Sequence, residues 1–225
     1  MRSKRYQKIN SKIDKNKSYS FEEAINIIKE NVSPNFDETI ELHVQLGINP
    51  HKTEQQARGT VTLPHGVVKK RKIVAFVEEG KEKEAEKAGA DLTGGKKLIQ
   101  KIQEEGSCNF DVVVAHPSVM IDLAKVAKIL GPKGLMPSPK TGTIGIDVPK
   151  IIKELRSGKI TFKNDAGANL HQAVAKVSWS IKKIKDNIEE YLNVIKKAKP
   201  IGTKGLFIQK VFLSSTMGPA LKIAI

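Results

Sequence analysis

The chain has 225 residues, and its 39 Lys and Arg outnumber its 24 Asp and Glu, which gives a net charge of +15. A cationic excess spread along the chain favours a polyanionic partner: RNA, DNA or a membrane surface. The single cysteine, Cys108, excludes an internal disulfide and a zinc knuckle and indicates a reducing compartment. We expect neither a membrane span nor a secretory signal, because no apolar run of the required length is present.

The first elements follow a basic segment. Residues 1–19 carry seven Lys or Arg and one acid, which is typical of an arm that becomes ordered late. Ser20 and Glu23 then form the pattern of a capping box, in which the hydroxyl and the carboxylate satisfy each other's backbone amides. We expect this helix to end before Ser33-Pro34. Its predicted apolar face carries Ala24, Ile27 and Ile28.

Two strands and a boundary come next. Residues 39–46 alternate between apolar and polar, which predicts a half-buried strand, and a second strand is expected over 59–63. The turn residues Pro64, His65 and Gly66 precede a basic run at 69–72. Turn residues followed by a basic run favour a domain boundary.

The middle of the chain has a different pattern, in which wholly apolar strands alternate with helical segments. Strands are expected at 73–77, 90–92 and 110–115. Helices are expected at 81–88, around Leu98, Ile99 and Ile102, at 120–130 and at 148–155. This order predicts a parallel sheet covered on both faces.

The alternating style returns after a second boundary at 156–158. We expect a strand at 159–163, a long helix at 179–197, and strands at 206–213 and 220–225 joined by a tight turn at 216–219. The simplest architecture is an α+β domain built from both chain ends, with an α/β domain inserted into it. The boundaries are 1–66 with 159–225 for the former and 67–158 for the latter.

Candidate catalytic and phosphate sites are weak. Residues 134–141 nearly fit the spacing of a P-loop, but Pro139 stands where the second glycine belongs, and proline has no amide hydrogen to donate. His116 lies at the end of an apolar strand, but no nearby Ser, Cys or paired carboxylate completes a catalytic constellation with it. The five histidines, which show no metal-ligand spacing, are His43, His51, His65, His116 and His171. We therefore expect no catalytic group, no metal and no cofactor.

Three polar turns in the end domain could converge, and they are better candidates. An exposed Phe36 could stack on a base, and hydroxyls in the turn at 214–219 could donate to phosphates and 2′-hydroxyls. A turn running from 162 to His171 mixes cationic, amide and imidazole groups. Taken alone, each of them favours an ordinary turn over a binding site. The loop 131–137, with its glycines, prolines and lysines, could contact RNA or protein, or simply shape its domain. An aromatic content of 5% favours recognition of folded RNA over a stacking platform for single strands.

Five segments in order resemble one known family. They are Asn35-Phe36-Asp37-Glu38-Thr39, Arg58-Gly59-Thr60-Val61-Thr62-Leu63-Pro64-His65-Gly66, Ala88-Gly89-Ala90-Asp91, Ile129-Leu130-Gly131-Pro132-Lys133-Gly134-Leu135-Met136-Pro137 and Thr216-Met217-Gly218-Pro219. In these segments the chain resembles the bacterial-type large-subunit ribosomal protein L-one family. The match runs from about residue 4 to the C-terminus. The resemblance implies a split α+β domain, RRM-like and formed by both chain ends, with an inserted Rossmann-like α/β domain.

The resemblance also implies a function and a site. The function is binding of large-subunit rRNA in the stalk beside the tRNA exit site, with exit-site tRNA and other ribosomal components as neighbours, and repression of the protein's own mRNA. Its location is cytoplasmic, on a bacterial ribosome, or on an organellar one. The RNA-binding residues carried over by position are Phe36, Asp37, Thr39, Lys163, Asn164, Asp165, His171, Ser214, Thr216, Met217 and Gly218. Ala166 stands where many relatives have lysine, which removes one phosphate contact.

Two alternatives belong to other classes. A nucleotide-dependent enzyme would use the central α/β domain, and nucleotide binding by residues 67–158 would favour it. A membrane-surface protein would use the charge, but the sequence has no basic amphipathic helix with an aromatic apolar face.

Overall fold

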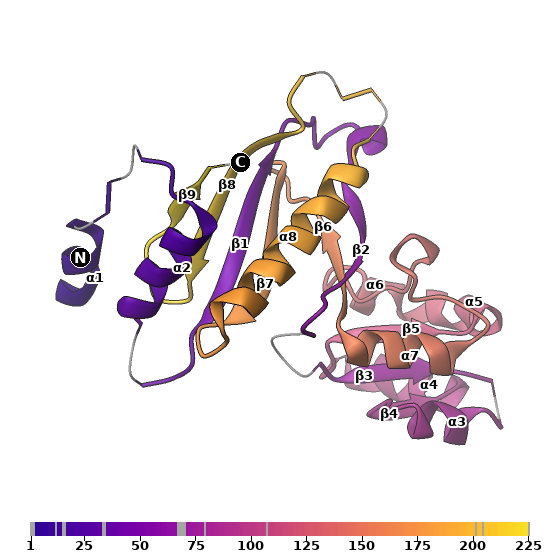
Figure 1. Cartoon of the computed structure of the whole chain (residues 1–225). Coiled ribbons are helices and arrows are strands. Elements are labelled where there is room, and N and C mark those ends of the chain that lie inside the picture. Colours follow the sequence, from indigo (N-terminus) through magenta and orange to yellow (C-terminus); the bar gives the residue numbers. More distant parts are fainter. Residues whose placement is uncertain are drawn as a thin grey trace. The chain divides into compact units, whose positions relative to one another are not determined.

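A computed structural model describes residues 3–224 except 12, 15–16, 33–34, 67–70, 79, 107, 201 and 204. The chain divides into two compact units, one made of Met1–Val68 with Thr161–Ile225 and the other of Lys69–Ile160. Figure 1 shows the elements of both.

The first unit is built on a four-stranded antiparallel sheet in the order β7-β1-β8-β9. Strand β1 (Thr39–Leu46) pairs on one side with β7 (Asn169–Lys176) and on the other with β8 (Ile208–Ser215), and β9 (Leu221–Ile223) forms an edge. The central strand therefore comes from the first quarter of the chain, whereas its neighbours come from the last quarter.

Two helices, α2 (Phe21–Glu30) and α8 (Ile181–Lys197), cover one face of this sheet (Figure 1). Alternate residues of β1 are fully buried, as the pleat requires when one face of a sheet packs on helices. The capping box of Ser20 and Glu23 opens α2 as expected. The buried side chains between sheet and helices include Ile25, Ile28, Ile40, Leu42, Val44, Val211, Leu213, Ile184, Ile188 and Tyr191.

The other face of the sheet is polar. Because side chains alternate along each strand, the residues beside the buried ones point away from α2 and α8. Cross-strand pairs on this face include His43 with His171, His43 with Phe212, and Glu41 with Ser214. We call it the open face. It is formed by Glu41, His43, Gln45, His171, Lys210, Phe212, Ser214 and Lys222.

Smaller elements complete the first unit. Helix α1 (Lys4–Ser11) occupies the segment that the sequence suggested as a late-ordering arm. Strands β2 (Arg58–Thr62) and β6 (Lys159–Lys163) form a two-stranded sheet. A Cβ at Gly59 would lie 2.9 Å from the Phe162 ring, so glycine lets that ring pack on β2. A single 3-10 turn spans Thr53–Gln55.

The second unit contains a parallel three-stranded sheet in the order β4-β3-β5. Strand β3 (Ile73–Phe76) is buried along its whole length, because helices pack on both faces. The sheet is completed by β4 (Leu92–Gly94) and β5 (Val112–Ala115). The helices are α3 (Glu82–Lys87), α4 (Lys96–Glu105), α5 (Met120–Leu123), α6 (Ala127–Leu130) and α7 (Val148–Ser157).

Several expectations need correction. The sequence pattern missed β7 and placed His171 in a turn, whereas it lies on that strand. The helix expected over 120–130 is interrupted by a 3-10 turn at Ala124–Val126. In α2, Ala24 and Ile28 are buried as expected, but Ile25 takes the place predicted for Ile27, which is only partly buried. Strand β8 extends to Ser215, so Ser214 lies on a strand. Ser33-Pro34, and 69–70 of the basic run, lie outside the described residues.

Tyr191 provides a test of this core. Its hydroxyl is fully buried and has no hydrogen-bond partner among the residues that the structure describes, and its ring packs edge-on against Phe162. Burial raises the pKa of the hydroxyl. Because an unpartnered buried hydroxyl costs stability, Tyr191→Phe should raise the free energy of unfolding by up to about 1 kcal/mol. Urea denaturation measures it, and a clear loss of stability would show that the hydroxyl has a partner.

Candidate nucleic-acid interface

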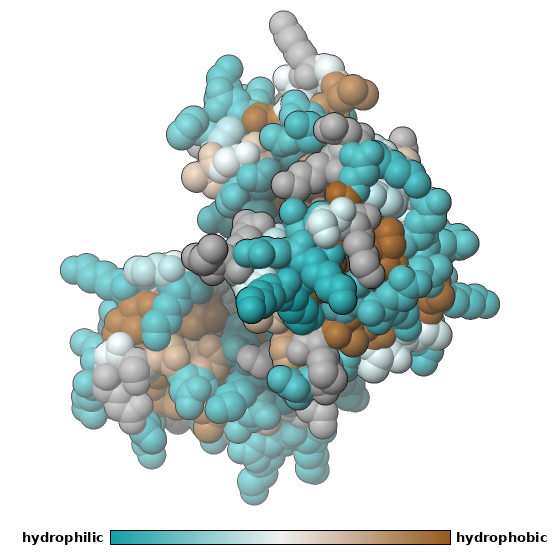
Figure 2. Space-filling model, turned by 90° about the vertical axis from the view of Figure 1, so that its left-hand side faces the viewer, coloured by the Kyte–Doolittle hydropathy of each residue, from teal (hydrophilic) through white to brown (hydrophobic). Residues whose placement is uncertain are grey.

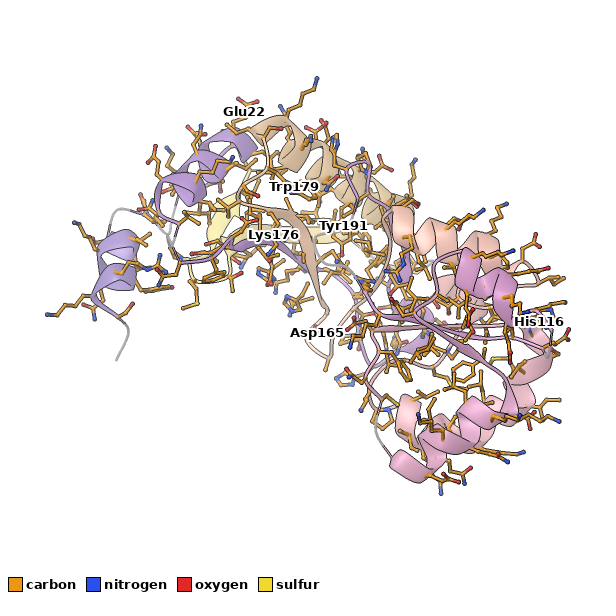
Figure 3. All side chains as sticks on the ribbon, turned by 90° about the horizontal axis from the view of Figure 1, so that it is seen from below. Glu22, His116, Asp165, Lys176, Trp179 and Tyr191 are labelled. Atoms are coloured by element: carbon orange, nitrogen blue, oxygen red, sulfur yellow. The ribbon has the colours of Figure 1, made fainter. Side chains whose placement is uncertain are left out.

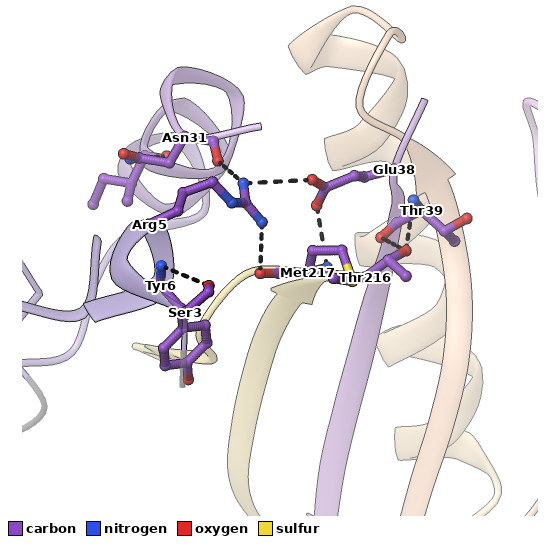
Figure 4. Close-up of polar contacts among 9 residues, drawn as sticks. Ser3, Arg5, Tyr6, Asn31, Glu38, Thr39, Thr216 and Met217 are labelled. Atoms are coloured by element: carbon purple, nitrogen blue, oxygen red, sulfur yellow. Dashed lines mark hydrogen bonds and ion pairs between the residues drawn. The ribbon is translucent and has the colours of Figure 1, made fainter. Parts of the chain in front are cut away.

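Two of the predicted polar turns meet at one end of the open face. The Thr39 amide donates to Thr216 Oγ1 (3.0 Å), and the Thr216 amide donates to the Thr39 carbonyl (3.0 Å) (Figure 4). The two residues extend the β1–β8 ladder, in which Ile40 pairs with Ser215. Residues 177 positions apart in the sequence are thereby held side by side.

These two turns expose large apolar side chains. The exposed fractions of Phe36 and Met217 are 48% and 53%, although both are surrounded in sequence by polar residues. A Cβ at position 218 would lie 2.5 Å from Ser215 Oγ, so a larger residue there would require the Ser215 side chain to move. The Thr216 hydroxyl accepts from the Thr39 amide and donates to the Thr39 carbonyl (3.3 Å), which leaves it able to accept one further hydrogen bond. This end of the sheet therefore presents two exposed apolar groups, one hydroxyl acceptor and a stretch of backbone without a side chain.

Asp37 has a structural task at the same end. Its carboxylate accepts hydrogen bonds from the Ser178 amide (3.1 Å) and hydroxyl (2.9 Å). Lys176 Nζ donates to the Asp37 carbonyl and to Thr39 Oγ1, each at 2.9 Å. The Asp37 carboxylate thus fixes the turn, and Lys176 places a cationic group beside Thr39.

The third predicted turn lies at the opposite end of the sheet. The β1–β7 register pairs Thr39 with Lys176 and Gln45 with Asn169, so the turn that precedes Asn169 is six residues along β1, about 20 Å away. Figure 3 shows Asp165 and Lys176 at the two ends of β7. The three turns therefore do not converge on one point, as the sequence had suggested they could.

Asp165 organises this third turn. Its carboxylate accepts hydrogen bonds from the amides of Gly167 (2.9 Å) and Asn169 (2.6 Å). The hydrogen bond from the Asn169 amide holds the pKa of Asp165 below its usual value. Asn164 is buried and its amide group donates to the Asp165 carbonyl, so it supports the turn from inside. Lys163 and Ala166 are exposed.

A pair of histidines lies between the two ends, on the open face. The Nδ1 atoms of His43 and His171 are 2.8 Å apart, and His43 Nε2 is 3.0 Å from Ser214 Oγ. A hydrogen bond between two imidazole nitrogens needs one of them to be unprotonated. Burial, followed by the charge of His171, lowers the pKa of His43, whereas Glu41 opposes the shift. His171 and Ser214 thus lie between the two ends of the candidate interface, the turn at Thr216 and the turn at Asp165.

The second unit has cavities at the carboxyl ends of its parallel strands, the larger of about 460 Å³ and lined by Gly94, Gly95, Lys96 and Lys101 among others. Ser118 and Glu78 lie near His116. Both contact the same nitrogen, Nδ1, at 2.7 and 3.4 Å, so the three do not form a relay from nucleophile to base to acid.

Within the described residues, no group of side chains could hold a metal ion, and no helix is long and apolar enough to cross a membrane. Hydrophilic side chains predominate over the surface seen in Figure 2, with hydrophobic ones in scattered patches. A surface of this kind, with a net charge of +15, suits an anionic partner better than an apolar one.

Comparison with known proteins decides the family. Residues 28–219 match the model of the "Ribosomal protein L1p/L10e family". The chain belongs to this family. "Large ribosomal subunit protein uL1" of Thermus thermophilus is 44% identical over 98% of this chain and 96% of that protein. The proteins of the same name from Kosmotoga olearia and Thermosipho africanus are 45% and 44% identical, over 99% and 98% of this chain and 96% and 95% of theirs. The resemblance to the bacterial-type family is therefore confirmed.

Some residues of this interface in the L1p/L10e chain were not predicted from the sequence. His43 could have been found, because it lies on the polar side of a correctly predicted alternating strand. Lys176 could not, because its position beside Thr39 depends on the register of β7. Arg5 and Glu38 also reach the turn at Met217, through contacts between distant segments.

The histidine pair should make the stability of this L1p/L10e chain depend on pH. Because the folded-state pKa of His43 lies below 6.5, its value in the unfolded chain, the unfolded state binds more protons in that range. The free energy of unfolding should therefore fall as pH drops through about 6.5 and level off below the folded-state pKa.

Urea denaturation from about pH 7.5 to about pH 5.5 tests this for the wild type and for His43→Gln. The variant should lose less stability over that range, whereas His51→Gln, at an exposed position, should behave like the wild type. Equal slopes for all three proteins would contradict the proposed role of His43.

Proposed function

We propose that this chain is a structural RNA-binding protein of the large ribosomal subunit, and that it binds rRNA of the stalk near the tRNA exit site. The observation that carries the proposal is the locked pair of turns at Thr39 and Thr216, which leads into an open polar sheet face. The names of its relatives place those proteins in the large subunit, which supports the same assignment here. On this proposal the chain is found on ribosomes, with exit-site tRNA and other ribosomal components as neighbours.

The end of the sheet at Thr39 and Thr216 suits close approach of folded RNA. Phe36 and Met217 offer exposed apolar surface for a base or a sugar, and the Thr216 side of the turn offers a hydroxyl. Because Gly218 has no side chain, a ribose or phosphate can come close to the backbone there. These contacts would supply the specific part of recognition.

The rest of the interface has side chains that can bind the phosphate backbone of RNA. Lys163, Lys210 and Lys222 bring cationic groups, with His171 and Ser214 between the two ends. A separation of about 20 Å between the ends fits an RNA with two strands or a bend better than one extended loop. A helical junction has such a shape, and a similar structure in the chain's own mRNA would allow repression of translation.

The proposal includes the domain organisation expected from the sequence. Residues 1–66 and 159–225 would form the RNA-binding domain, with 67–158 as the inserted domain. The contact-based units, with boundaries near 68 and 160, support this division.

Nothing favours the enzymatic alternative. Residues 135–138 have no regular secondary structure, a 3-10 turn follows at Pro139–Thr141, and the next helix, α7, begins only at Val148. The segment with nearly P-loop spacing is therefore not followed directly by a helix whose N-terminal amides could bind a phosphate.

Salt should weaken binding of the chain to a stalk rRNA fragment. Cationic side chains that neutralise phosphates release condensed counterions, so the logarithm of the association constant should fall linearly with that of salt concentration, by about 0.7–0.9 per phosphate contact. Fluorescence anisotropy at a series of salt concentrations measures the slope. An affinity that does not change with salt would contradict binding through phosphates.

Truncating the exposed apolar groups should weaken binding more than removing a remote charge. Met217→Ala and Phe36→Ala should each cost about 1–3 kcal/mol of binding free energy if they lie centrally in a desolvated interface. Lys182→Ala, an exposed position on α8, is the control for loss of one charge away from the open face. If all three variants bind alike, the turns are not the specific site.

A further inference from the structure

Helix α1 carries an arginine that reaches into the turn at Met217. The Arg5 guanidinium donates to the Met217 carbonyl (3.1 Å) and to the Asn31 carbonyl (3.2 Å), and Nη1 lies 3.9 Å from Glu38 Oε1 (Figure 4). One side chain thereby joins the N-terminal helix, the end of α2, the start of β1 and the turn after β8. Arg5 is 212 residues from Met217 in the sequence.

Glu38 holds the same turn from the other side. Its Oε2 accepts a hydrogen bond from the Met217 amide (3.2 Å), and its side chain is fully buried. The amide and the carbonyl of Met217 are therefore held by the two members of one ion pair. We call Arg5, Glu38 and the Met217 backbone the clamp.

Packing fixes α1 in the position that the clamp needs. Ile9 is 6% exposed, and with Ile13 it lines a small, almost filled cavity whose other walls are Ile28, Gly218 and Leu221 among others. Apolar contact on one side and the arginine on the other attach the helix to α2 and to the turn. The basic segment at the chain's start is thus part of the structure that surrounds the candidate interface.

The physical chemistry of the clamp favours a single conformation. A buried carboxylate that loses its cation is strongly destabilised, so Glu38 favours the arrangement in which Arg5 is present. The planar guanidinium has several donors in fixed directions on separate nitrogens and can reach two carbonyls and a carboxylate together, whereas a lysine has its three donors on a single nitrogen. Meanwhile the Met217 side chain is 53% exposed, so its own packing does little to order the turn.

We propose that Arg5, acting with Glu38, is a positioning residue that orders the turn of Thr216, Met217 and Gly218 for RNA before RNA binds. This inference rests on the proposed function. A turn that is already ordered loses less conformational entropy on binding, so the clamp contributes to affinity without contacting RNA. The N-terminal helix then acts through the shape of the turn and not through its charge.

Amide hydrogen exchange in the free protein tests the clamp without RNA. In Arg5→Gln, the amide of Met217 should exchange several-fold faster than in the wild type, because its acceptor Glu38 has lost its cation. Arg5→Lys should restore only part of the protection. Lys8→Gln removes one charge from the same helix and should leave exchange at Met217 unchanged.

Binding of the rRNA fragment at several salt concentrations then separates positioning from direct contact. Arg5→Gln should bind about three- to tenfold more weakly with the same salt slope, because RNA binding must then also order the turn. Glu38→Gln should weaken binding in the same direction. A shallower slope with unchanged exchange would show that Arg5 contacts a phosphate, which overturns the proposal.

Unchanged exchange and unchanged affinity in Arg5→Gln would also overturn it. Failure of the wild type to bind the rRNA fragment would contradict the proposed function instead, while the exchange comparison would still decide whether Arg5 orders the turn. Circular dichroism and thermal unfolding of each variant show that a change in affinity does not come from loss of the fold.

Discussion

The pairing of β1 with both β7 and β8 is the constraint on which the first unit depends. A strand from the first quarter of the chain takes the centre of a sheet whose other strands come from the last quarter. Its buried residues, Ile40, Leu42, Val44 and Leu46, also require the cover of α2 and α8. The chain's two ends must therefore fold together, because neither end alone can hydrogen-bond or bury this strand.

The registers of these two ladders decide what the interface contains. The pairing of Ile40 with Ser215 puts Thr39 beside Thr216, and the pairing of His43 with His171 puts two imidazoles in contact. A slip by one residue would turn the buried side chains outward and separate these pairs. The same hydrogen bonds thus stabilise the sheet and place the groups that we propose for RNA contact, and the Arg5–Glu38 clamp adds a local restraint at one end.

The sequence predicted those elements whose signal is local. Strand β1 has a clean alternation and α2 has a capping box, and both were located correctly from the sequence. Strand β7 was missed because Gln172, Ala173 and Ala175 blur its alternation, and its place in the sheet is fixed by pairing with β1. The division into two domains and the individual RNA contacts stay predictions.

The candidate site shows the same limit. Phe36, Thr216 and Met217 could be proposed from the types of residue in polar turns and from the family resemblance. Their meeting at one end of the sheet, and the separation of Asp165 at the other, followed only from the strand registers. Arg5 and Glu38 could not be predicted, because their role depends on contacts between segments about 180 residues or more apart.

Crosslinking of the chain to RNA within assembled large ribosomal subunits tests the central claim most directly. Mass spectrometry would identify the crosslinked residues, and sequencing of the RNA would identify the nucleotides. The account predicts crosslinks at Phe36, Met217 and His171, all to nucleotides of the stalk rRNA. Crosslinks confined to residues 69–160, or to rRNA away from the stalk, would contradict it.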